Sequence, residues 1–113
     1  MTQHDVEVAL RHMYDHAAEA AALADGRIRE DLDTDRLFAL ALTRLVEIIG
    51  EAARRVPEKI RADHPEIPWR EIVGTRNRLV HGYDAVDHDI LWKIAAEELP
   101  LLSERLRTII EEL

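Results

Sequence analysis

Residues 33–56 read DTDRLFALALTRLVEIIGEAARRV, and this stretch decides the fold of the 113-residue chain. Its apolar residues recur at spacings of three and four, which predicts an α-helix. Asp33 or Thr34 can cap the start of this helix, and Pro57 marks its end near Val56. One apolar set comprises Leu37, Leu40, Ala41, Leu45, Ile48 and Ala52, and another comprises Phe38, Leu42, Val46 and Ile49. One bundle core does not need so wide a stripe, so we expect this helix to face a second subunit as well.

The rest of the chain predicts helices on both sides of this segment. An alanine-rich amphipathic helix is expected over about residues 5–25, where Asp25-Gly26 ends it. A short helical turn follows Pro57, and Pro68 suits the first position of another helix. A last helix is expected over about residues 86–113, with a bend at Pro100. No strand-like alternation is present, so we predict an all-α fold, an antiparallel four-helix bundle with one additional short helix.

Composition bounds the class of protein. The length predicts a single domain over residues 1–113. The chain has no cysteine, which excludes a disulfide framework and thiolate catalysis. It has no basic-then-apolar leader and no apolar run of membrane-spanning length, so we expect a cytoplasmic protein without membrane contact. A net charge of −8 argues against extended nucleic-acid coating, but Arg70, Arg76 and Arg78 outnumber Glu71 and predict a local positive field.

The helix after Pro68 leads into the motif Arg76-Asn77-Arg78-Leu79-Val80-His81-Gly82-Tyr83. Gly82 can take the left-handed conformation that ends a helix, so His81 is expected in the last turn and Tyr83 just outside it. Asn77 and His81 are four residues apart and would share a helix face. Arg76 is five residues from His81, roughly 140° around the axis. A long side chain, an irregular last turn or a second subunit would have to bring Arg76 and His81 onto one substrate.

The form R-x4-H-x-Y of this motif resembles that of the HEPN superfamily, specifically the HepT-like toxins that pair with minimal nucleotidyltransferase antitoxins. Further stretches in the same order carry the resemblance, which is close from about Arg27 to Trp92. These stretches are Leu45 to Ala53, His64 to Gly74 and Val86 to Trp92.

The resemblance implies a toxin that is a metal-independent endoribonuclease and needs no cofactor. His81 would be its catalytic acid or base, since an imidazole titrates near neutrality and can move a 2′-hydroxyl proton. Arg76 would hold the scissile phosphate. The partner antitoxin would adenylylate Tyr83, placing bulk and negative charge beside Arg76 and His81. Apart from the resemblance, the expected place of Asn77 on the helix face of His81 would let it orient the imidazole or bind a phosphate, with a solvent-facing residue as the alternative.

RNA cleavage uses an acid and a base, whereas one chain supplies only His81 from the motif. A homodimer would supply two copies, and a higher hetero-oligomer with the antitoxin is a further possibility. An alternative function is that of a non-catalytic helical dimer, a binding module that scaffolds a nucleotidyltransferase. Loss of growth arrest on changing His81 would separate the two hypotheses.

Other polar clusters have ordinary explanations. Glu47 and Glu51 are four apart on the second helix, where surface salt bridges are expected and a contact that orients Arg76 is the alternative. His12 and His16 have a metal-ligand spacing, but no third ligand is in register, so we expect no metal site. Residues 87–89 (Asp-His-Asp) are expected to cap the last helix.

Overall fold

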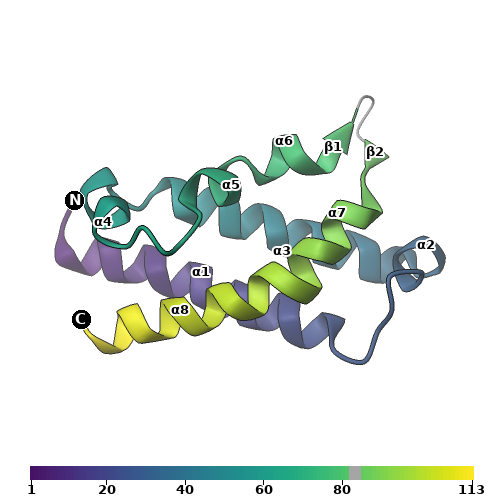
Figure 1. Ribbon diagram of the computed structural model, residues 1–113, viewed down its shortest axis with the longest axis horizontal. Coiled ribbons are helices and arrows are strands. Elements are labelled where there is room, and N and C mark those ends of the chain that lie inside the picture. The colour runs from purple at the N-terminus through teal and green to yellow at the C-terminus, as the bar shows by residue number, and fades with distance from the viewer. Residues whose placement is uncertain (82–84) are drawn as a thin grey trace.

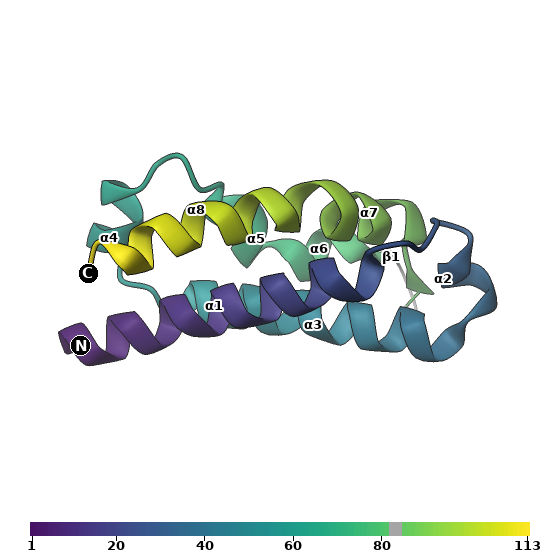
Figure 2. The same ribbon diagram turned by 90° about the horizontal axis from the view of Figure 1, so that it is seen from below.

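The structure is a computed structural model, and it describes residues 1–81 and 85–113. The helices are α1 (Gln3–Ala24), α2 (Asp31–Thr34), α3 (Arg36–Arg54), α4 (Glu58–Asp63), α5 (Trp69–Val73), α6 (Thr75–Leu79), α7 (His88–Lys93), the π-helical η1 (Ile94–Glu98) and α8 (Leu99–Glu111), and the strands are β1 (Val80–His81) and β2 (Ala85–Val86). In Figure 1 the chain runs from left to right along α1, back along α3, from left to right again along α5 and α6, and back along the α7–η1–α8 run. Both termini therefore lie at one end of the bundle, and α2 and the β1–β2 hairpin lie at the other (Figures 1 and 2). The predicted all-α fold is confirmed.

The long helices pair through apolar faces. α1 begins with a capping box, in which the Thr2 hydroxyl accepts from the Asp5 backbone N–H and the Asp5 carboxylate accepts from the Thr2 backbone N–H. Its buried face meets that of α3 and of α8 in one core. The most deeply buried large side chains of this core include Leu10, Met13, Leu42, Ile49, Leu91 and Leu106.

The predicted cap of α3 is wrong by one or two residues. Residues 31–34 form the separate turn α2, so the backbone becomes extended only at Asp35, which caps α3 by accepting the Phe38 N–H at 3.1 Å. Asp35 also accepts from the guanidinium of Arg27 at 2.8 Å.

The two apolar sets of α3 have different surroundings. Phe38, Leu42, Val46 and Ile49 are buried in the core, whereas Leu37 is 79% and Leu40 51% exposed. Ala41 is also exposed, Leu45 and Ile48 are half-buried, and Ala52 is buried. Much of the set that begins with Leu37 therefore lies outside the core of a single chain.

The helix predicted after Pro68 is broken at Gly74 into α5 and α6. α5 packs closely on α3, because a Cβ atom on Gly50 would lie 2.9 Å from the carbonyl oxygen of Ile72. That carbonyl accepts from the hydroxyl of the buried Thr75 at 2.6 Å. The close approach at Gly50 and the Thr75 hydrogen bond thus both involve the Ile72 carbonyl, next to the break. The motif begins on α6, directly after the break.

The predicted end of the motif helix at Gly82 is also wrong. α6 ends at Leu79, Val80 is already extended, and β1 pairs antiparallel with β2, Val80 opposite Val86 and His81 opposite Ala85. The Leu79 carbonyl accepts from the Asp87 N–H at 2.7 Å instead of continuing a helix. Two paired, β-branched valines favour this short strand pairing over a further helical turn.

The C-terminal run keeps the predicted stripe but changes its winding before Pro100. Asp87 caps α7 by accepting from the N–H groups of Asp89 and Ile90, as predicted. Residues 94–98 then form the π-helical turn η1, in which the Leu99 N–H bonds to the Ile94 carbonyl. Pro100 has no N–H and its ring would clash with the carbonyl four residues earlier, so a wider turn accommodates it. Within the described residues, no helix is both long enough and apolar enough to cross a bilayer.

Candidate functional site

Arg76 stands on α6 at the meeting of two small pockets against α3. One pocket, of 160 Å³, is lined by Thr43, Glu47, Arg76, Leu79, Val80 and Val86, and the other, of 100 Å³, by Glu47, Gly50, Glu51, Arg54, Val73, Thr75 and Arg76. Arg76 is exposed, and no hydrogen bond or ion pair joins its guanidinium to any side chain that the structure describes. Its charge is therefore available to a ligand.

The structure places only part of the rest of the motif. The backbone of His81 lies on β1, and its side chain falls outside what the structure describes. Gly82 and Tyr83 lie outside the described residues altogether. The expectation that Asn77 and His81 share a helix face is wrong, because α6 ends before His81. Asn77 is exposed on α6 and makes no side-chain hydrogen bond with the described residues.

Arg78 differs from Arg76 in its surroundings. Its guanidinium donates to both carboxylate oxygens of Glu98, at 3.0 and 2.8 Å. This bidentate hydrogen bond raises the pKa of Arg78, and the paired charge cannot add to a positive field as the sequence suggested. Arg76 thus carries the free charge of α6, and Arg78 ties α6 to η1.

Of Glu47 and Glu51, only Glu51 makes the expected surface ion pair among the described residues. Arg44 pairs with Glu51 at 3.2 Å, with both side chains largely exposed. Glu47 is half-buried and lines both pockets that Arg76 lines. A carboxylate thus lines the same two pockets as Arg76, but no hydrogen bond joins the two residues.

His12 and His16 interact with each other through the backbone. The Nδ1 of His16 lies 2.7 Å from the His12 carbonyl oxygen, and the two rings meet edge to face at 6.1 Å. No group of three or more metal-ligating side chains occurs among the described residues.

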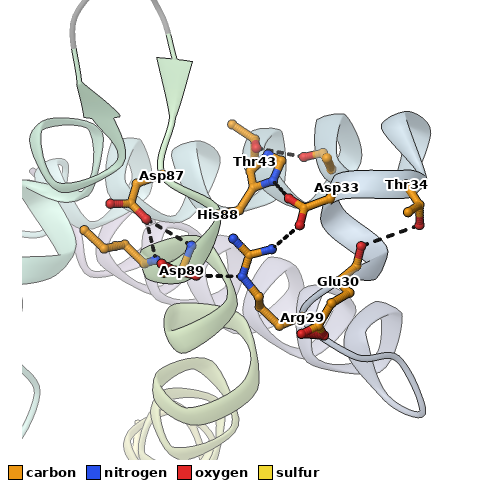
Figure 3. A network of polar contacts seen from close by, with 10 residues as sticks. Arg29, Glu30, Asp33, Thr34, Thr43, Asp87, His88 and Asp89 are labelled. Carbon is orange, nitrogen blue, oxygen red and sulfur yellow. Dashed lines mark hydrogen bonds and ion pairs between the residues drawn. The ribbon is translucent and has the colours of Figure 1, made fainter.

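A polar network that sequence reasoning missed lies at the hairpin end of the bundle (Figure 3). Arg29 donates to Asp33 and to Asp89 at 2.6 Å each, and the His88 Nδ1 lies 2.7 Å from Asp33. The hydrogen bond from His88, and then that from Arg29, hold the pKa of Asp33 below its ordinary value. The spacing of Arg29 and Asp33 signals a local pair, but no sequence signal joins them to residues some 55 positions later.

Comparison with known proteins identifies the family of this chain. Residues 13–109 match the family model described as Ribonuclease HepT-like. A protein of Thermococcus cleftensis, provisionally named a ribonuclease HepT, is 41% identical over 97 residues, covering 80% of this chain and 88% of its own length.

Two further relatives are provisionally named RNases. One, from Caldanaerobacter subterraneus, is 36% identical over 83 residues and 74% of each chain. The other, from Methanocaldococcus jannaschii, is 30% identical over 109 residues, covering 96% of this chain and all of its own. No solved structure matches the chain. The family-model match and these relatives together show that the chain belongs to the HepT-like ribonucleases, of the HEPN type.

Proposed function

We propose that this protein is the toxin of a toxin–antitoxin pair and cleaves RNA with Arg76 and His81. The observation that supports this most is the unpaired guanidinium of Arg76 on a pocket wall, beside an Arg78 that Glu98 neutralises. A charge left without a protein partner at a pocket is suited to bind an anion, and the phosphodiester of RNA is the anion of this family's substrate. We also propose that residues 1–113 form a single HepT-like domain.

The chemistry needs a proton acceptor, a proton donor and charge stabilisation. In the proposed reaction the ribose 2′-oxygen loses its proton to an imidazole and attacks the adjacent phosphorus, while the 5′-oxygen leaves and takes up a proton. Arg76 neutralises the charge that grows on the non-bridging oxygens. His81 carries one of the two proton transfers, and no metal ion is required.

A homodimer would supply the second proton-transfer group. Leu37 and Leu40 support this assembly, because large apolar side chains on one exposed helix face are typical of a protein interface. These residues precede the part of α3 that faces Arg76, so a partner seated there would come close to the site. A two-fold dimer is expected in sedimentation, and a monomer that cleaves RNA would contradict this part of the proposal.

We further propose that a nucleotidyltransferase antitoxin adenylylates Tyr83. The support is the R-x4-H-x-Y form of the motif and the relationship to a protein named HepT. An AMP group on Tyr83 would bring phosphate to a residue seven positions from Arg76, where it would compete with the RNA phosphate.

Cleavage of labelled RNA, measured with excess chelator, tests the catalytic assignment. His81→Ala should lower the rate by about 10²–10⁴-fold, and Arg76→Ala by about 10²–10³-fold. Arg107→Ala is the matched control, an exposed arginine of α8 that pairs only loosely with Glu111 at 3.7 Å. Full activity of either motif variant, or a strict requirement for a divalent metal, would refute the mechanism. Growth arrest that survives His81→Ala would favour a scaffold without catalysis.

A further inference from the structure

A larger pocket, of 420 Å³, adjoins the Arg76 pocket on the side of the hairpin. Thr43 of α3 and Val86 of β2 line both pockets, so the two hollows share a wall. The larger pocket is also lined by Arg36, His88 and Leu40, so a second subunit seated on Leu37 and Leu40 would border this pocket. An RNA strand bound in the Arg76 pocket can therefore continue past Thr43 and Val86 into the larger pocket.

Arg36 has a charge without a partner. It is the first residue of α3, is exposed, and makes no hydrogen bond or ion pair with the described residues. The arginines nearby in the sequence differ, because Arg27 pairs with two aspartates and Arg29 pairs with two others. Arg36 and Thr43 are seven residues apart on one helix face, about 10 Å along the axis. That distance corresponds to at most about three nucleotides, since successive charges of one strand are about 3.4 Å apart even in a duplex.

His88 is held in one orientation by its carboxylate partner. Its Nδ1 must carry the hydrogen in the 2.7 Å contact with Asp33, because a carboxylate only accepts. The other oxygen of Asp33 accepts from Arg29, so the charge of this carboxylate is offset. The second ring nitrogen, Nε2, makes no hydrogen bond with the described residues. Figure 3 shows the His88 ring beside Thr43 and Asp33.

Thr43 offers a second acceptor at the shared wall. Its hydroxyl donates to the Ala39 carbonyl at 2.7 Å, which leaves the lone pairs of its oxygen available. A neutral His88 with its proton on Nδ1 likewise presents Nε2 as an acceptor. An acceptor beside a cation matches a nucleotide that brings a ribose hydroxyl and a phosphate. The hydroxyl donates its one hydrogen either to Nε2 or to the Thr43 oxygen, and a deoxyribose lacks that hydroxyl.

We propose that this pocket is a second nucleotide subsite, which holds the ribonucleotide next to the cleaved phosphodiester. Arg36 binds the flanking phosphate, and the flanking 2′-hydroxyl donates its one hydrogen to His88 Nε2, beside the Thr43 hydroxyl. The proposal rests on the proposed RNA cleavage at Arg76 and His81. In this proposal the larger pocket binds the RNA strand and takes no part in its cleavage.

Short substrates test the subsite. The parent protein is given a dinucleotide with one phosphodiester, and trinucleotides that extend it on the 5′ or the 3′ side. One extension should raise kcat/KM about tenfold, the size of one charge-assisted hydrogen bond. Arg36→Ala should bring the ratio of extended to dinucleotide kcat/KM down to about one, while Arg107→Ala should keep the parent ratio. A ratio does not depend on the fraction of active protein, and sedimentation of each variant controls for association.

A second variant tests the sugar contact. His88→Asn keeps a nitrogen that can donate to Asp33 but has no Nε2. The parent should cleave the extended substrate several-fold faster than a version with one 2′-deoxy sugar at the flanking position, and His88→Asn should lose that preference. An unchanged extension ratio in Arg36→Ala, or no gain from either extension in the parent, would overturn the subsite. If the parent cleaves no RNA of any length, the proposed function itself fails and the subsite with it.

Discussion

Gly50→Ala tests the contact that seats α5 on α3. Alanine is about 1 kcal/mol more favourable than glycine inside a helix, so the substitution would stabilise α3 alone. The new Cβ, however, would lie 2.9 Å from the Ile72 carbonyl oxygen, where ordinary contact begins at 3.4 Å. Overpacking of this kind costs about 1–3 kcal/mol, and the obstacle is backbone, which cannot rotate away.

We therefore expect Gly50→Ala to lower the free energy of unfolding by about 1 kcal/mol, with a fall in Tm of about 4 °C. α5 must withdraw by about half an ångström, and α6 follows it with Arg76. Since a 1 Å misplacement can cost about 10²-fold in rate, RNA cleavage should fall by about tenfold.

Urea unfolding followed by circular dichroism, and RNA cleavage on the same samples, measure both effects. Ala41→Gly is the control, because Ala41 is exposed on the same helix and the loss of helix propensity costs about 1 kcal/mol. Since Ala41 adjoins the face proposed for the dimer, sedimentation checks that association is unchanged. Ala41→Gly should leave cleavage unchanged at equal protein concentration. A Gly50→Ala protein that is about 1 kcal/mol more stable than the parent, with full activity, would refute the close approach of α5.

Three further changes have defined outcomes. Asp35→Ala removes the cap of α3 and should lower the free energy of unfolding by about 1 kcal/mol in urea, while Asp35→Asn, which keeps an acceptor, should recover most of it. Asp33 has a pKa lowered by its hydrogen bond from His88, so its contribution to stability is present above about pH 4 and is lost as the pH falls toward the folded-state pKa. The stability of Asp33→Asn should depend less on pH between neutral and acid than that of the parent protein. An equal loss of stability in acid would contradict a lowered pKa of Asp33. Tyr83→Phe, co-expressed with the nucleotidyltransferase and analysed by intact mass, should gain no AMP and escape neutralisation, and a gain of AMP would disprove the assignment of Tyr83.

The helices were predictable because their cause is local. The spacing of apolar residues in α1, α3 and the C-terminal run is set by burial of one face, and this pattern is visible in the sequence. The break at Gly74 was not predictable, since it depends on the approach of Gly50 to Ile72 from another helix. The hairpin was missed because pairing of two-residue strands leaves no periodicity to detect.

The features of the candidate site likewise fall into those that local sequence indicates and those that depend on contacts between distant residues. Arg76, His81 and Tyr83 could be proposed as a site from the sequence, because their residue types and spacing lie within eight positions, and their roles stay predictions. The neutralisation of Arg78 by Glu98, twenty residues later, could not be found from spacing. The network of Arg29 with later residues has the same origin, because the return of the chain along the bundle brings distant charges together.

The π-helical turn before Pro100 has a consequence for the length of related chains. A π-turn takes up one residue more than an α-turn while keeping the faces of the flanking helix segments aligned. Loss of one residue within 94–98 would therefore restore a regular helix without rotating the buried stripe of α8 relative to α7. In that regular helix Pro100 would clash with the carbonyl four residues before it. The extra residue and the proline should accordingly be gained or lost together, so that a one-residue gap in an aligned relative marks a chain without proline at this position.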